Sequence, residues 1–242
     1  HPVDRRQRQM CIRDRGLSFG KALAKSLDKP FIAVNHLEGH ALSPKISSQL
    51  DYPYLLLLIS GGHSQFLNVI NFGKYKRLGT TIDDALGEAF DKTAKLLGIE
   101  FPGGPQIEVL AKKGDPNKFD LPKPILNKGG CNLSFAGLKT AVLKISKNIK
   151  NEQDKFDLAA SFQNTIEKIL YKKTKIAFDA YEKQSNPKKK VLVVAGGVAA
   201  NKNIRSMLKS LCANEDYQSI FPPIELCGDL SLIHISEPTR LQ

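Results

Sequence analysis

Cysteine is scarce in this chain of 242 residues, and its four cysteines lie far apart. Cys11, Cys131, Cys212 and Cys227 form no C-x-x-C pair, so neither a disulfide scaffold nor a zinc ribbon is indicated. Long hydrophobic runs are also missing, because the longest uncharged apolar stretch, Tyr54–Ile59, is far shorter than the roughly 20 residues that span a bilayer. No charged-then-apolar leader opens the sequence. We therefore expect no membrane association, no classical secretion, and a place in the reducing cytoplasm.

Arginine is almost absent from the middle of the chain. Only two arginines occur between residues 16 and 226, whereas residues 1–15 alone contain five. Residues 230–242 follow no helix or strand signal, and both ends resemble translated sequencing-adapter read-through. We therefore predict three parts: a non-native stretch over 1–15, a folded core over 16–229, and a non-native tail over 230–242.

Basic residues outnumber acidic ones, 36 to 24, which gives a formal charge of +12, and an apolar content of 41% is sufficient for a core. Between Lys139 and Lys190 there are 13 lysines and 6 acids. No aromatic residues alternate with these lysines, so contact with a nucleic-acid duplex or phosphate backbone fits better than single-strand stacking. A merely solubilising surface is the alternative interpretation.

Two short apolar runs, Tyr54–Ile59 and Val191–Ala195, each end at a double glycine. This pattern is typical of a buried strand that enters a tight loop. Between them, apolar residues recur at helical spacing over Ile82–Leu97 and again over Leu158–Tyr181. Because strands alternate with helices, the sequence predicts an α/β fold.

Local signals also suggest where these elements end. Thr80, Thr81 or Asp83 would cap the first helix and Gly98 would stop it. The segment Leu121–Gly130, rich in proline, lysine and glycine, indicates a loop.

His36 and His40 are separated by one helical turn, which is close enough for both imidazoles to hold one metal ion. Such pairs also occur by chance as structural or solvated histidines. The motif differs from the zinc-protease pattern H-E-x-x-H, because Leu37 takes the place of the glutamate and Glu38 lies at a different helical angle. A protease mechanism therefore lacks its general base.

Paired glycines occur in three loops. They are Ser60–Ser64, Ala195–Asn201 and Phe101–Pro105, of which the first two follow the predicted strands. Glycine lets the backbone approach a ligand closely and direct amide N–H groups at phosphate oxygens. Each loop alone could be an ordinary turn, but two such loops together favour a nucleotide cleft.

These motifs resemble those of the tRNA N6-adenosine threonylcarbamoyltransferase family, once called O-sialoglycoprotein endopeptidases. The matching segments occur in the family's order and are VNHLEGHALSP, ISGGHSQ, IDDALGEAFDKTAKLLG, PGGP, LSFAGLKTAV and AGGVAANKNIR. The resemblance implies the actin-like and Hsp70-like ATPase fold, with ribonuclease-H-like lobes facing each other across a nucleotide cleft. The family's N-terminal half has no counterpart before Gly16, so the chain is expected to be a fragment truncated at both ends. A missing lobe would expose apolar surface on the strand that starts at Tyr54.

The resemblance also implies the residues of the site. His36 and His40 correspond to the two histidine ligands of a divalent metal ion, with iron favoured over zinc, and Asp229 corresponds to the third ligand. The residues implied to contact the substrate, threonylcarbamoyl-AMP, are Leu58, Ile59, Ser60, Gly61, Gly62, Asp91, Gly104, Glu108 and Asn201. Considered alone, Asp91 could be a solvated helix charge and Asn201 a helix cap.

The implied reaction transfers the threonylcarbamoyl group from threonylcarbamoyl-AMP to N6 of the adenosine beside the anticodon, in tRNAs that read codons beginning with A. The implied partners are tRNA and the accessory proteins of the bacterial complex, namely a paralogous non-catalytic protein and a small ATPase. Two alternatives remain open. One is a sugar or acetate kinase of the same fold, and the other is a non-catalytic protein that binds metal and nucleotide.

Overall fold

The computed structural model describes residues 16–33, 35–224 and 227. These residues divide into two units, the first ending at His36 and the second beginning at Leu37. In the first unit residues 16–26 form a helix whose apolar side chains, such as Phe19 and Leu23, are exposed. The predicted non-native stretch over 1–15 and the tail over 230–242 lie outside the described residues, so that prediction stays open.

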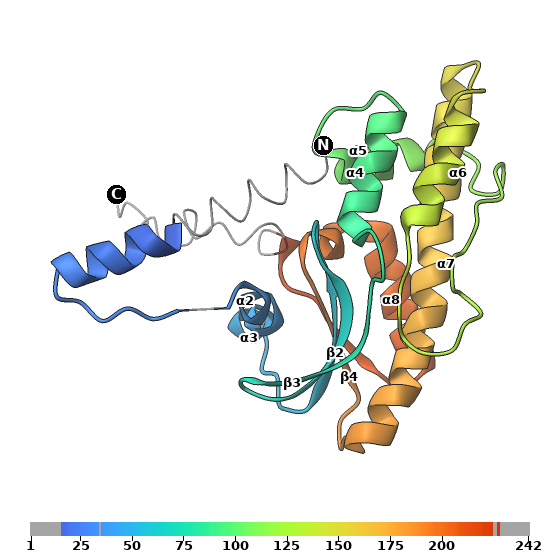
Figure 1. Cartoon of the computed structure of the whole chain (residues 1–242). Coiled ribbons are helices and arrows are strands. Elements are labelled where there is room, and N and C mark those ends of the chain that lie inside the picture. The colour runs from blue at the N-terminus through green and yellow to red at the C-terminus, as the bar shows by residue number, and fades with distance from the viewer. Residues whose placement is uncertain (1–15, 34, 225–226, 228–242) are drawn as a thin grey trace, which may run out of the picture. The chain divides into compact units, whose positions relative to one another are not determined.

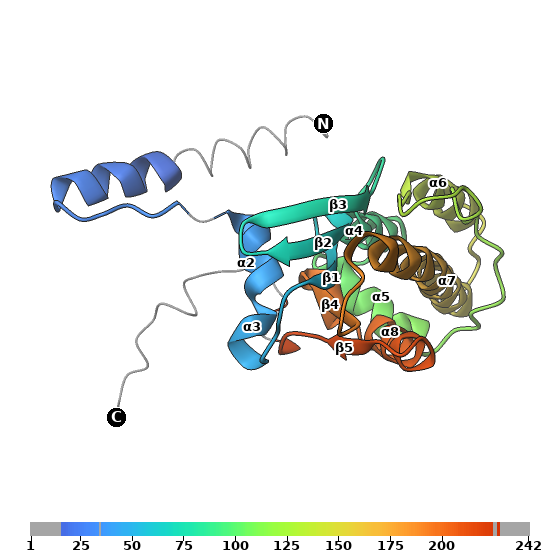
Figure 2. The same ribbon diagram turned by 90° about the horizontal axis from the view of Figure 1, so that it is seen from below.

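The second unit contains one five-stranded mixed sheet (Figures 1 and 2). Its strands are β1 (Tyr54–Ile59), β2 (Ser64–Asn71), β3 (Lys74–Thr80), β4 (Val191–Ala195) and β5 (Gln218–Ile220). They lie in the order β3-β2-β1-β4-β5, with β2 antiparallel to both of its neighbours and β1, β4 and β5 parallel to one another. This order is the ribonuclease-H-like topology that was expected, and both predicted strands have their predicted bounds.

Helices cover both faces of this sheet. Figure 2 shows the larger group on one side and α2 and α3 on the other. The larger group comprises α4 (Leu86–Leu96), α5 (Gly103–Ala111), α6 (Ala136–Ser146), α7 (Glu152–Ser185) and α8 (Lys202–Asn214), with the 3-10 turn η1 (Gly197–Ala200) before α8. The smaller group comprises α2 (His36–Leu42) and α3 (Pro44–Ser47). Among the described residues, no helix is both long and apolar enough to cross a membrane.

Alternation along β1 divides the core in two. Leu55, Leu57 and Ile59 pack toward the larger helix group, whereas Tyr54, Leu56 and Leu58 pack with β4 and with Ala41 of α2. The Tyr54 hydroxyl donates to the Ala41 carbonyl oxygen at 3.0 Å. All six residues of β1 are buried. The expectation that this strand exposes apolar surface is therefore wrong, because α2 covers its second face.

The start of α4 differs from the prediction. The helix begins at Leu86, four residues later than the apolar pattern indicated, and none of the three proposed caps serves it. The Leu86 N–H instead donates to Ser64 Oγ at 2.8 Å. Asp83 Oδ1 accepts the Phe135 and Ala136 N–H groups at 2.7 and 3.2 Å, so Asp83 caps α6. The predicted stop is confirmed, because Gly98 has a positive φ of 75°.

Candidate functional site at the carboxyl edge of the sheet

The turn after β1 is the first part of the site. The Ser60 N–H donates to the His63 carbonyl oxygen at 2.7 Å, and the His63 N–H donates to Ser60 Oγ at 3.1 Å. The N-terminus of α4 rests on this turn, with the Gly87 N–H donating to the Ser60 carbonyl oxygen at 3.2 Å. A Cβ on Gly87 would lie 2.8 Å from Gly61 Cα, so only glycine allows this approach. Gly61 and Gly62 are themselves exposed.

The loop after β4 is the second part of the site, and it lies against the end of β1. Gly196 has a φ of 97°, and a Cβ there would lie 2.5 Å from the Ile59 carbonyl oxygen. Leu58 pairs with Ala195 in the parallel ladder, which brings the two glycine loops to the same edge. The structure therefore unites two loops that are far apart in the sequence.

Helices α4 and α5 supply three more of the candidate residues. Asp91 Oδ1 accepts the Gly103 N–H at 3.0 Å and so fixes the first turn of α5 on α4. A Cβ on Gly104 would make only an ordinary contact, with Phe90 Cβ 4.0 Å away. Glu108 Oε1 accepts the Lys202 N–H at 3.1 Å, which joins α5 to the start of α8. Asp91 and Glu108 thus each place a carboxylate at the N-terminus of a helix, where negative charge is favourable.

Asn201 caps α8 and is held from behind by α7. Its Oδ1 accepts the Ile204 N–H at 3.0 Å, as a helix cap does. Its side-chain amide also pairs with that of Gln163, through bonds of 3.1 and 3.3 Å, and Gln163 donates to Glu167 at 2.9 Å. Burial raises the pKa of Glu167. Sequence patterns did not reveal Gln163, because its partner is on a different helix.

The proposed metal ligands begin with α2. His36 is its exposed first residue, and His40, one turn later, is 1% exposed. Glu38, between them, accepts the Tyr75 hydroxyl on its Oε1 at 2.6 Å. Asp229 lies outside the described residues, and within them no group of three His, Cys, Asp or Glu side chains is arranged to hold a metal. The described residues thus place two histidines one turn apart on α2, and imidazole is a donor that iron and zinc accept.

Not every lysine of the basic stretch between Lys139 and Lys190 is free on the surface. Lys173 is 1% exposed and donates to the carbonyl oxygens of Lys128 and Gly130 at 2.9 and 3.1 Å. Burial lowers the pKa of Lys173. Lys189 and Lys190 form ion pairs with Asp51 and Glu182 at 3.1 and 3.0 Å. These three lysines therefore have structural partners, which leaves fewer charges for an anionic ligand than the count implied.

Comparison with known structures supports the fold. Full-length HypF, solved in its phosphate- and nucleotide-bound form, superimposes with a TM-score of 0.60 at 14% identity, over 86% of this chain and 35% of HypF. At that identity the likeness defines the fold alone, and it agrees with the mixed sheet described above. The chain has an α/β fold of the actin-like ATPase class.

Comparison of sequences defines the family. The family model for TsaD, the tRNA N6-adenosine threonylcarbamoyltransferase, matches residues 14–232, and the chain belongs to this family. The transferase of Pelagibacter ubique is 77% identical over 214 residues, and that of Rickettsia rickettsii is 55% identical over 217. Each match covers 88% of this chain, but only 60% and 63% of the respective relative. The chain thus spans less than two thirds of the length of these relatives.

Proposed function

We propose that this chain carries the threonylcarbamoyl-transfer site of a tRNA-modifying enzyme. The substrates would be threonylcarbamoyl-AMP and the adenosine beside the anticodon in tRNAs that read codons beginning with A. The observation that supports this best is the joining of the Ser60–Gly62 turn and the Gly196–Asn201 loop at one sheet edge, in a chain of this family.

The site residues suggest how the substrate would be held. The exposed glycines of the first turn would let the phosphate of the adenylate approach backbone N–H groups. Gly104 leaves room beside α5, while Glu108 and Asn201 would contact the remainder of the nucleotide. N6 would attack the carbamoyl carbon, the bond from that carbon to the phosphate oxygen would break, and N6 would lose a proton as AMP departs. Because an adenine amine is a weak nucleophile, positioning must lower most of the barrier.

A metal ion fits the same proposal. The imidazoles of His36 and His40 would hold it together with Asp229, and iron is favoured over zinc. When bound, the ion would supply Lewis-acid chemistry near the carbonyl or phosphate oxygen. The role of this chain's residues would be to bind and orient the ion. Hydrogen bonds from the Tyr54 and Tyr75 hydroxyls hold α2, which carries both histidines, in place.

Partners and location follow from the same assignment. A tRNA-modifying enzyme must reach tRNA, so we place the protein in the cytoplasm. We also propose that it works with a paralogous non-catalytic protein and a small ATPase. The kinase alternative and the non-catalytic alternative have no support from the family match.

Transfer is tested by incubating the chain with threonylcarbamoyl-AMP and tRNA, then digesting the tRNA to nucleosides for mass spectrometry. The segment of the Pelagibacter relative that this chain does not match is added in a parallel reaction. Threonylcarbamoyladenosine is the expected product in that reaction. If the chain forms no modified nucleoside but releases ADP when it is given ATP and a small acceptor, the result would instead support a kinase.

Binding is tested separately by calorimetry with a non-hydrolysable analogue of the adenylate. Glu108→Gln keeps an acceptor for the Lys202 N–H but loses the charge, so we expect affinity to fall roughly tenfold. Glu100→Gln, at an exposed neighbouring position, is the matched control. Equal affinities for the two variants would exclude Glu108 from the site.

Metal binding is tested by elemental analysis. His36→Ala removes an exposed side chain, so the fold should survive while metal affinity falls by orders of magnitude. His40→Ala should have the same effect, and His63→Ala serves as the control. If all three variants retain as much metal as the parent, the assignment is wrong.

A further inference from the structure

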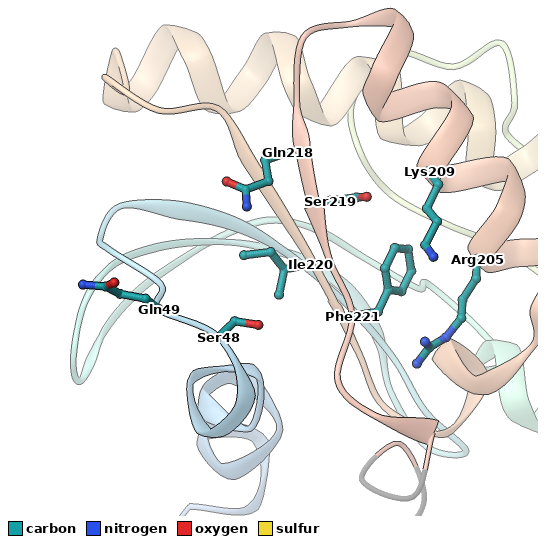
Figure 3. Close-up of a pocket in the computed structure, with 8 residues that line it drawn as sticks. All are labelled: Ser48, Gln49, Arg205, Lys209, Gln218, Ser219, Ile220 and Phe221. Atoms are coloured by element: carbon teal, nitrogen blue, oxygen red, sulfur yellow. The ribbon is translucent and has the colours of Figure 1, made fainter.

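A polar hollow of about 410 Å³ lies beside β5, the edge strand of the sheet. Figure 3 shows Arg205 and Lys209 reaching from α8 toward Phe221, while Ser48 and Gln49 approach from the other side of β5. Both basic residues lie on one face of α8, one turn apart. Among the residues that the structure describes, the lining contains two cations and no carboxylate.

Arg205 is fixed in position without being neutralised. Its guanidinium donates to the carbonyl oxygens of Ala199 and Pro222 and, at 3.1 Å, to Cys227 Sγ. It also stacks on the Phe221 ring, 5.0 Å from the centroid. All of these partners are uncharged, so within the described part of the chain the positive charge remains available to an anion. A fixed guanidinium loses little further entropy when it binds a ligand.

Lys209 and β5 add further donors. Lys209 is exposed and has no hydrogen bond or ion pair within the described part of the chain. The Gln218 N–H donates to the Lys190 carbonyl oxygen on the β4 side. In a parallel pair the backbone N–H and C=O groups of alternate residues point away from the partner strand. The Ser219 N–H therefore faces the open edge, and Ser219 also lines the hollow. A cation pair with neutral donors is the arrangement that binds phosphate oxygens.

A second hollow, of about 440 Å³, continues this surface. It shares Gln49, Gln218 and Ile220 with the first, and it reaches Lys188 and Lys189 at its far end. Lys188 is exposed and unpaired among the described residues, whereas Lys189 forms a bridge to Asp51. The two hollows form one surface along the sheet edge from Lys188 to Arg205, which we call the β5 track.

We propose that the β5 track binds the phosphate backbone of a structured RNA. Cations at both ends, joined by serine and glutamine side chains, suit a ligand with repeated negative charges more than a single small anion. The proposal rests on the proposed function, because the RNA it implies is the tRNA substrate.

The track also leads to the candidate site. Arg205 donates to the carbonyl oxygen of Ala199, which lies in η1 within the second glycine loop, two residues before Asn201. RNA held along β5 would therefore reach the edge where the adenylate is expected. An acidic peptide would also match the positive charge of the β5 track. Its binding would not explain why the track leads to the glycine loop where the adenylate is expected.

The test uses the 242-residue chain and a fluorescein-labelled anticodon stem–loop hairpin, with affinity measured by anisotropy across a KCl titration. Each lost phosphate contact lowers the slope of log K against log salt by about 0.9. Lys209→Gln and Lys188→Gln should each show this decrease, and the double variant should show about 1.8. Lys95→Gln, an exposed lysine of α4 outside both hollows, should keep the parent slope.

Two results would overturn the proposal. One is a Lys209→Gln slope equal to that of Lys95→Gln, and the other is displacement of the RNA by poly-glutamate at equal charge concentration. Adenylate affinity, measured in parallel, separates this proposal from the proposed function. If the variants keep the parent's salt slope while adenylate binding is intact, only the proposal that the β5 track binds RNA is refuted. If the chain binds RNA as expected but does not bind the adenylate, the proposed transfer site is refuted.

Discussion

Replacing Gly87 with alanine tests how closely α4 approaches the turn after β1. Alanine at a helical position normally stabilises a protein by about 1 kcal/mol relative to glycine. Here the new Cβ would lie 2.8 Å from Gly61 Cα and 2.9 Å from the Ser60 carbonyl oxygen. Carbon atoms pack at about 3.5 Å or more, so the turn or the helix must move by roughly 0.7 Å. Overpacking of this kind costs about 1–3 kcal/mol, which exceeds the helical gain.

We therefore expect Gly87→Ala to lower the free energy of unfolding by up to about 2 kcal/mol, the overpacking cost less the helical gain. Gly104→Ala is the matched control, because Gly104 is likewise the second residue of its helix and its nearest neighbour would be 4.0 Å from a Cβ. That variant should gain up to about 1 kcal/mol. The assay is urea denaturation with the slope m compared between variants. If Gly87→Ala is as stable as Gly104→Ala, the close approach does not constrain the site.

Three further substitutions test contacts that hold loops and helix ends. Asp157, which is 6% exposed, accepts the Asp115 N–H at 2.8 Å, and this bond lowers the pKa of its carboxyl. The carboxylate contributes fully to the free energy of unfolding above the ordinary pKa of aspartate, and this contribution is lost as pH falls through the lowered pKa of the folded protein. The difference in stability between the parent and Asp157→Asn should therefore shrink on acidification. A difference that does not change with pH would contradict this. Asp83→Ala should cost about 1–2 kcal/mol and speed amide exchange at Phe135, and unchanged exchange would show that the cap is dispensable. Lys173→Met should cost about 1–3 kcal/mol in a denaturant titration, because two carbonyl groups lose their donor, and a neutral result would mean that water replaces it.

Features that depend on neighbouring residues could be predicted from the sequence. Both strands that end in double glycines have their predicted bounds, since short apolar runs between turn residues define a buried strand locally. The helix over Leu158–Tyr181 is present and longer, as α7, because Asn151 caps it and Asn186 ends it in a left-handed conformation. The His36 and His40 spacing does fall on a helix.

Features that depend on distant partners could not be predicted in this way. Asp83 looked like a cap for the nearest helix, but it serves α6 some fifty residues later in the chain. The Phe101–Pro105 segment looked like a loop, yet α5 begins at Gly103 because Asp91 accepts its N–H and α4 packs against it. The roles of Asp229 and of the substrate residues remain predictions, and among the substrate residues the Glu108→Gln variant tests that of Glu108.

The parallel pairing of β1 with β4 has a consequence for synthesis on the ribosome. Leu55 is made before α4 to α7, whereas its partner Leu192 follows only after all four helices have been made. Until then β1 has an unpaired edge and an apolar row without its β4 neighbours, a state that favours aggregation. Closing so long a loop is also slow. We expect the nascent chain to depend on chaperones during this interval, and the substrate edge to form only after β4 has been made.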